Sequence, residues 1–251
     1  MSPHRAAFAV ACLLLPAFAV GADDAAEAKA IIEKAIKAQG LKPDSPEMAE
    51  SWKDAGSLSF GGMKMEYVAD WTFQPPAAYR FDMTTKFNGQ DMKLAVVMNG
   101  KEAWQAANGA PLPIEPKKLD SMKHETYQLW VTSLLPLLRE KEFKLSMLPE
   151  GQIDGKPAQG VKVVREGHRE VSLFFDRETG LLAKMESTVP DEFQGWKEVK
   201  DEAFFSDYKD VGGLKRFCKM KIVRDGKPLL ETVLSEQKRM EKADPKIFDK
   251  P

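Results

Sequence analysis

The sequence predicts an α+β protein built on a curved antiparallel β-sheet, and three observations support this fold class. Apolar residues occupy the odd positions over 63–73 and return at positions 79, 81, 83 and 87, which is the period of a strand with one dry face. Asn-Gly pairs at 88–89, 99–100 and 108–109 separate such runs, and this dipeptide is a strong hairpin signal. Only two segments have helical periodicity. We expect about ten or eleven strands, and a twisted sheet of that size curls on itself.

The amino-terminal residues 1–22 are typical of a signal peptide. A histidine and an arginine precede an apolar run at 6–20, and small residues end at Ala22. The run is shorter than the roughly 20 residues that a membrane span needs. We expect cleavage after Ala22 and an exported chain, periplasmic or secreted, in which residues 23–251 form one domain. A lipoprotein anchored through Cys12 is the alternative.

Composition excludes some classes of partner. The chain has 37 basic and 38 acidic residues and a formal net charge of −1. Such a balance gives no basic patch for nucleic acid. Cleavage would leave Cys218 as the only cysteine, so no internal disulfide is possible and stability must come from core burial.

Two helices are expected. The first follows the signal peptide and ends at Gly40, where a C-cap glycine is common; its apolar stripe is Ala28, Ile31, Ile32, Ala35 and Ile36. The second covers Lys117–Arg139 after Pro116, a residue suited to a first turn. Pro136 should kink or end this helix early.

The other strands follow from alternation between turn signals. We expect them at 92–98, 103–107, 143–147, 160–165, 169–175, 181–187, 198–205, 214–224 and 229–239. Val189–Gln194 is expected to be an irregular excursion. The first helix is expected to cover part of the apolar face of the sheet, and the proline-flanked second helix is the candidate lid over the rest.

The apolar face of the first strands is the candidate ligand site. Its residues are Met63, Met65, Tyr67, Trp71, Phe73, Tyr79, Phe81, Met83, Phe87, Met92, Leu94, Val96 and Met98. Flexible methionines suit a pocket that repacks around variable acyl chains. The same residues fit a core packed against the two helices, and both interpretations stay open. On the second helix Trp130, Leu134 and Leu138 would be lid contacts or permanent core.

Catalytic and metal-binding signals are weak. His124 and His168 have no second histidine or cysteine at metal-ligand spacing. Cys218 shares the parity of apolar neighbours on its strand, as a buried cysteine does. Nucleophile-elbow, phosphate-loop and dinucleotide motifs do not occur in the sequence. We therefore expect no enzyme activity, no catalytic residue, no metal and no cofactor.

Several short motifs together resemble the LolA family of periplasmic lipoprotein carriers. They are a strand ending at Pro75, then Ala78-Tyr79-Arg80-Phe81, Asn99-Gly100-Lys101 with Trp104, Phe175–Leu182, Tyr208–Lys215 and Phe248–Pro251. The resemblance implies an unclosed antiparallel half-barrel whose mouth is covered by helices and whose concave face binds acyl chains. In the carriers an arginine immediately before the proline closes the lid. Gln74 stands there in this chain, and Arg80 has the parity of the polar face.

Three hypotheses follow. The first is an exported, non-enzymatic protein that binds a lipid or an acylated protein in the half-barrel, with a role in lipoprotein or lipid transport. The second is an interaction or sensor module of the same fold, with a self-filled core and an envelope protein as its partner. The third, less favoured, is a hydrolase that uses Cys218. Nucleic acid is not an expected partner, and no transmembrane segment is expected in the mature chain.

Overall fold

The computed structural model describes residues 20–87 and 89–251. Its strands are β1 (Ala49–Phe60), β2 (Met63–Gln74), β3 (Ala78–Phe87), β4 (Gln90–Asn99), β5 (Glu102–Ala107), β6 (Ala110–Leu112), β7 (Lys144–Ile153), β8 (Lys156–Val164), β9 (Val171–Asp176), β10 (Leu182–Asp191), β11 (Lys197–Val211), β12 (Leu214–Arg224) and β13 (Lys227–Met240). Its α-helices are α1 (Val20–Ala38), α2 (Pro116–Thr132) and α3 (Pro136–Arg139), and two 3₁₀ turns are η1 (Glu192–Gln194) and η2 (Pro245–Phe248).

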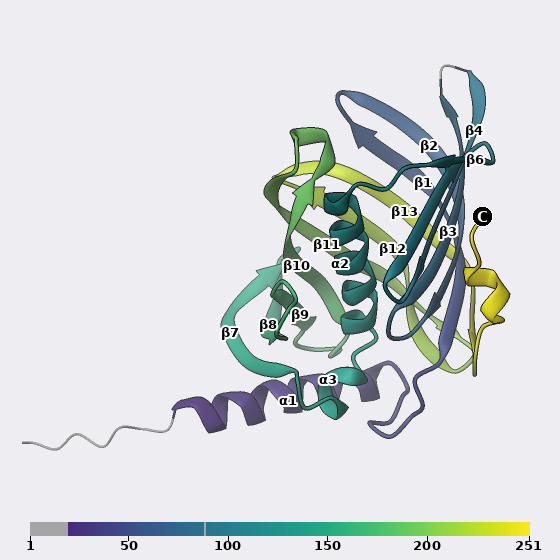
Figure 1. The fold of residues 1–251 in the computed structure, drawn as a ribbon. Coiled ribbons are helices and arrows are strands. Elements are labelled where there is room, and N and C mark those ends of the chain that lie inside the picture. Colours follow the sequence, from purple (N-terminus) through teal and green to yellow (C-terminus); the bar gives the residue numbers. More distant parts are fainter. Residues whose placement is uncertain (1–19, 88) are drawn as a thin grey trace, which may run out of the picture.

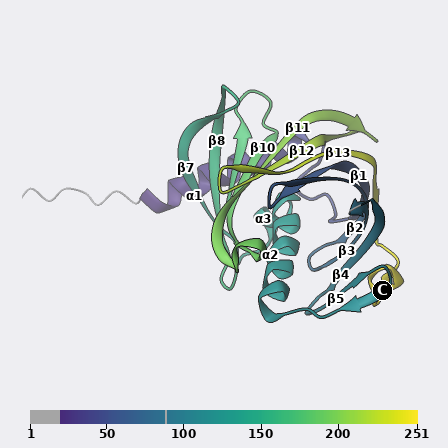
Figure 2. The same cartoon turned by 90° about the horizontal axis from the view of Figure 1, so that it is seen from above.

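All the strands form one curved, unclosed antiparallel sheet (Figures 1 and 2). The strand order is β6-β5-β4-β3-β2-β1-β13-β12-β11-β10-β9-β8-β7. The sheet is therefore a run of hairpins in which only β1 and β13 join strands distant in sequence. The predicted fold class, an α+β half-barrel, is confirmed.

The sheet has 13 strands rather than the expected ten or eleven. The additional strands are β1, whose inward positions include Asp54 and Gly56 and so break the apolar alternation, and the short edge strand β6. The expected irregular segment Val189–Gln194 is also partly wrong, because β10 continues to Asp191 along β11. Pairing with β9 ends at Ser187. Pro190 therefore lies on a free edge, where its missing N–H breaks no ladder bond.

The helices cover different parts of the sheet. The stripe of α1 is buried as expected, and this helix packs against β7, β8 and α3. Helix α2 crosses the opening of the half-barrel and contacts β10 on one flank and β4 on the other (Figure 2). Pro136 follows the end of α2 and starts α3, so the predicted early stop is confirmed. None of the described helices is long and apolar enough to cross a membrane.

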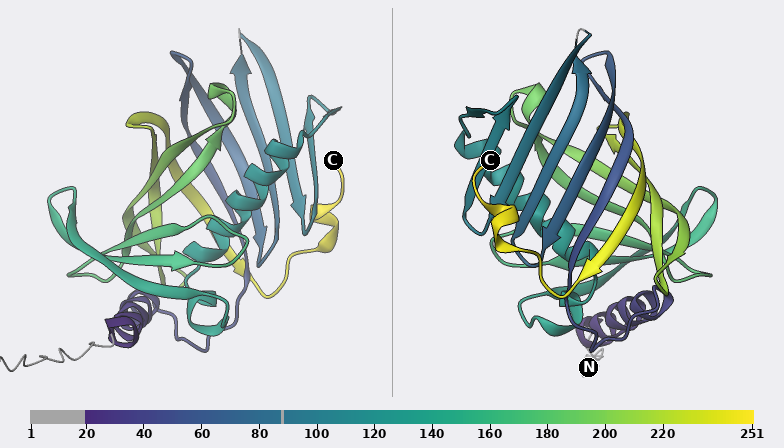
Figure 3. Two further views of the ribbon diagram at one scale, coloured as in Figure 1. Left: turned by 60° about the vertical axis from the view of Figure 1, so that its left-hand side comes forward. Right: turned by 90° about the vertical axis from the view of Figure 1, so that its right-hand side faces the viewer.

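Part of the outer face of the sheet is buried rather than exposed to solvent. The carboxyl-terminal η2 lies against β3 and β4 (Figure 3, right), where Phe248 packs with Ala49 and the fully buried Val97. The predicted signal peptide, residues 1–22, lies outside the described residues apart from the start of α1, as do Cys12 and Asn88.

Candidate functional site

A cavity of about 510 Å³ lies between α2 and the concave face of the sheet. This volume is within the range of small-molecule sites, which are mostly apolar with a few placed polar groups. Its wall is formed by strands β1–β4 and β11–β13 together with α2. A second hollow, of about 810 Å³, is lined by many charged and turn residues, among them Lys64, Asp154 and Lys221. The apolar cavity under α2 is the better candidate site.

Most of the predicted ligand residues line this cavity. They are Tyr67, Trp71, Phe73, Tyr79, Phe81, Met83, Leu94 and Val96. Met65 and Met92 are partly buried, Met98 is in the main core, and Met63 and Phe87 are 45% and 41% exposed. The alternation runs past the cavity because strands β2–β4 extend beyond it toward their hairpin tips. That the lining residues contact a ligand remains a prediction.

The predicted lid residues lie elsewhere. Trp130 and Leu134 are buried in the main core and Leu138 packs against it, whereas α2 presents Met122, Glu125, Leu129 and Thr132, among others, to the cavity. The most apolar stripe of α2 is therefore its packing face, and a mixed stripe faces the cavity. Sequence reasoning also missed Trp52, Asp54, Arg216 and Arg239, which no apolar pattern marks.

Four aromatic rings gather on the cavity wall, and we call them the aromatic cluster: Trp52, Trp71, Tyr79 and Phe81. Trp71 is central, with ring centroids 5.5 Å from Trp52, 5.8 Å from Tyr79 and 4.5 Å from Phe81. Strand pairing explains the arrangement, because Trp52 is opposite Trp71, and Trp71 is opposite Phe81.

Asp54 is a buried carboxyl beside the aromatic cluster. It is 5% exposed, and the hydroxyl of Tyr67 donates a hydrogen bond to its Oδ2 at 3.2 Å. Its Oδ1, the indole N–H of Trp71 and the hydroxyl of Thr232 have no hydrogen-bond partner among the described residues. Burial raises the pKa of Asp54 from 3.8 to about 6, although Tyr67, Trp71 and Thr232 oppose this shift.

We expect Asp54→Asn to stabilise the protein at pH 8. Because the pKa of Asp54 is higher in the folded chain, the folded state binds more protons between pH 4 and pH 6, and the free energy of unfolding falls as pH rises through this window. The difference between 3.8 and about 6 corresponds to at most about 3 kcal/mol. Urea unfolding should show the variant about 1–3 kcal/mol more stable at pH 8 and equal to the parent at pH 4. A gain at pH 4 as large as at pH 8 would contradict this account.

Glu125 connects α2 to the sheet across the cavity. The hydroxyl of Tyr79, which is 1% exposed, donates to Glu125 Oε2 at 3.1 Å. Glu125 is an exposed residue of α2, and it lines the cavity. Burial raises the pKa of Glu125, opposed by the Tyr79 hydrogen bond and by Lys118.

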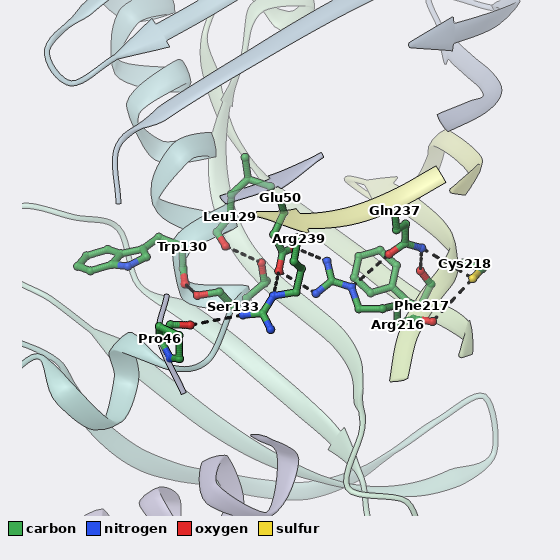
Figure 4. Close-up of polar contacts among 11 residues, drawn as sticks. Pro46, Glu50, Leu129, Trp130, Ser133, Arg216, Phe217, Cys218, Gln237 and Arg239 are labelled. Atoms are coloured by element: carbon green, nitrogen blue, oxygen red, sulfur yellow. Dashed lines mark hydrogen bonds and ion pairs between the residues drawn. The ribbon is translucent and has the colours of Figure 1, made fainter. Parts of the chain in front are cut away.

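A cluster of two arginines and one glutamate lies at another part of the cavity wall. Glu50 accepts two hydrogen bonds from Arg216, one of them at 2.8 Å from Nη1, and its Oε1 is 3.4 Å from Nε of Arg239 (Figure 4). Arg239 also donates to the carbonyl of Pro46 at 3.5 Å, and Arg216 donates to Gln237 at 3.2 Å. One carboxylate is thus shared by two guanidinium groups.

The two histidines lie on either side of Tyr127, whereas Cys218 makes its contacts on another part of the sheet. His124 is buried, its Nε2 is 3.4 Å from the Ser187 hydroxyl, and burial, with a contribution from Arg169, lowers its pKa to about 4. His168 stacks on Tyr127 at 4.1 Å. Cys218 is buried and its thiol donates to the carbonyl of Arg216 at 3.7 Å. Among the described residues no group of three His, Cys, Asp or Glu side chains could hold a metal ion.

No protein-family model and no curated protein matches the sequence. Solved structures match the fold across nearly its whole length. A LolA superfamily protein from Nitrosomonas europaea is similar with a TM-score of 0.56 and 12% identity, covering 89% of this chain and 97% of that one. The chain has a LolA-like fold.

Two further structures agree with this LolA-like fold. A DUF1329 family protein from Desulfovibrio piger has a TM-score of 0.55 at 14% identity, covering 88% of this chain and 97% of that one. An outer membrane lipoprotein-sorting protein domain from Vibrio parahaemolyticus has a TM-score of 0.54 at 11% identity, with the same coverage. The resemblance predicted from the motifs is confirmed for the fold.

The position expected to close the lid is used differently in this LolA-like chain. Gln74 accepts a hydrogen bond from the backbone N–H of Ala243 at 3.0 Å, so it holds the carboxyl-terminal segment. Arg80 lies on the outer face, as its parity predicted, where it pairs with Asp82 at 2.5 Å and donates to the carbonyl of Ile247. Other contacts hold α2, including Tyr79 to Glu125 and Gln128 to Ser187 at 2.6 Å.

Proposed function

We propose that this protein is an exported, non-enzymatic binder of a lipid or acylated ligand, which it holds in the cavity under α2. The observation that carries the proposal is the apolar-walled cavity of about 510 Å³ inside a LolA-like half-barrel. A core filled by its own side chains would leave no such volume, which is why we prefer a binder to an interaction module. The lipoprotein-sorting neighbour from Vibrio parahaemolyticus supports a role in lipid or lipoprotein transport.

The location of the protein is part of this proposal. Residues 1–22 have the pattern of a cleaved signal peptide, and we propose a periplasmic or secreted mature chain from Asp23. Amino-terminal sequencing of the protein from the periplasmic fraction tests it. A chain that retains its first residues in the cytoplasm would contradict it.

Binding can be tested directly with a neutral fluorescent probe, N-phenyl-1-naphthylamine, and with saturated alcohols that displace it. Apolar burial should provide the affinity, at about 0.8 kcal/mol per CH₂. Affinity should therefore rise about fourfold for each added carbon between octanol and decanol. Absence of a saturable probe signal, together with no lipid extracted from the natively purified protein, would refute the proposed function.

We expect Ile222→Trp to reduce binding of decanol at least tenfold. Ile222 lines the cavity between Ala203 and Leu230 on the neighbouring strands, so a larger ring there fills the space that a chain would occupy. The matched control is Lys221→Trp, on the outer face of the same strand, which should leave binding unchanged. Equal loss in both variants would show that the tryptophan acts through stability instead.

A further inference from the structure

Asp54 is a cavity carboxyl that forms no ion pair with any of the described residues. Its Oδ1 has no hydrogen-bond partner among the described residues, and it is 5% exposed on the cavity wall. The groups that act on this carboxyl are all uncharged: the Tyr67 hydroxyl donates to Oδ2 at 3.2 Å, and the indole of Trp71 and the hydroxyl of Thr232 also favour its ionised form, whereas no lysine or arginine does. A buried anion without a cation is costly, so this position favours a ligand that brings positive charge.

The surrounding rings have the same preference. Asp54 pairs with Ala69 on β2. Trp71 and Tyr67 lie two residues on either side of Ala69, so their side chains are on the same face of the sheet as Asp54. The face of an aromatic ring attracts an ammonium group, most strongly when the site is desolvated. The aromatic cluster and the carboxylate together make the kind of wall that recognises alkylammonium ions.

The two cavity arginines do not neutralise Asp54. Arg216 and Arg239 share the carboxylate of Glu50, which lies four residues before Asp54 on β1. At about 3.3 Å per residue the two carboxylates are about 13 Å apart along the strand. The Glu50–Arg216–Arg239 cluster and Asp54 are therefore separate charged groups on the cavity wall, with Trp52 between them on β1.

We propose that Asp54 and the aromatic cluster bind the ammonium group of a long-chain amine, whose hydrocarbon tail occupies the apolar part of the cavity. This inference rests on the proposed function and narrows it to amphiphiles with a cationic head. The free Oδ1 of Asp54 accepts a hydrogen bond from the ammonium group, and the rings of Trp71 and Phe81 contact it through their faces.

The test compares three ten-carbon ligands that differ only in the head group: decylamine, decanol and decanoate. Each displaces N-phenyl-1-naphthylamine from the full protein at pH 7.5. We expect decylamine to bind at least tenfold more tightly than the other two. Asp54→Asn should abolish this preference while decanol still binds, and the control Asp70→Asn, on the exposed face of β2, should retain it.

A second variant tests the same subsite, so the test does not depend on whether Asp54→Asn folds. Trp71→Leu should weaken decylamine binding severalfold with little change for decanol, because only the cation uses the ring face. Equal affinities for the three ligands, tighter binding of decanoate, or a preference that survives in Asp54→Asn would overturn the subsite and leave the proposed function standing. If none of the three displaces the probe, the proposed function itself fails.

Discussion

Trp130→Ala is expected to lower the free energy of unfolding by about 3–5 kcal/mol, the usual cost of truncating a buried tryptophan. The indole is 7% exposed and its N–H donates to Glu47 Oε2 at 3.0 Å. One face receives the guanidinium of Arg165 at 4.7 Å, and Phe143 packs at 5.3 Å. The substitution removes all three contacts and leaves Glu47 without its donor. Urea unfolding followed by circular dichroism measures the loss.

The control is Lys123→Ala, an exposed position on the same helix, which should change stability by less than about 0.5 kcal/mol. If Trp130 is permanent core, α2 is a fixed cover and ligands enter at its ends or between its cavity-facing side chains. Amide exchange in α2 should then be as slow as in the central strands. A loss below about 1 kcal/mol would contradict this and favour a helix that opens as a lid.

The alternation of apolar residues predicted the strands whose two faces differ most. Strands β2, β3 and β4 follow from the sequence because one face of each is mostly apolar, with Thr85 on β3 as an exception. Strand β1 was not, because its inward face carries Glu50, Asp54 and Gly56 beside Trp52. Gly56 has a tertiary reason: a Cβ there would lie 2.0 Å from the carbonyl oxygen of Glu231 on β13. A single sequence does not reveal which distant strand approaches so closely.

The candidate site was predicted in the same uneven way. One wall of the cavity follows from periodicity, since Trp71, Phe81 and their neighbours share a parity. The face of α2 toward the cavity does not follow from periodicity. The strongest apolar stripe of α2 packs into the core, and the weaker stripe with Glu125 and Leu129 faces the cavity. Isolated charged residues indicate a binding site only after the fold has placed them on the wall of the cavity.

Glu50→Ala is expected to lower the free energy of unfolding by about 2–4 kcal/mol, because it removes the carboxylate that two guanidinium groups share. Breaking a buried ion pair by removing one partner costs about 3–5 kcal/mol, and partial water access lowers that figure here. The side chains of Glu50 and Arg216 are each 21% exposed and that of Arg239 is 17% exposed. Without the carboxylate the two guanidinium groups face each other unscreened. The loss should shrink at high salt, because ions screen the remaining repulsion.

A double-mutant cycle separates repulsion from lost packing. Arg239→Ala in the Glu50→Ala background should recover part of the loss, since it removes one of the two opposed charges. The control, Glu66→Ala, breaks the 3.9 Å pair of Glu66 with Lys64, both well exposed, and should cost less than about 0.5 kcal/mol. If the second substitution instead adds its own full cost, Arg239 is held by packing and by Pro46 rather than by Glu50. The two arginines would then keep their places without Glu50, and their charge would be available to an anionic ligand.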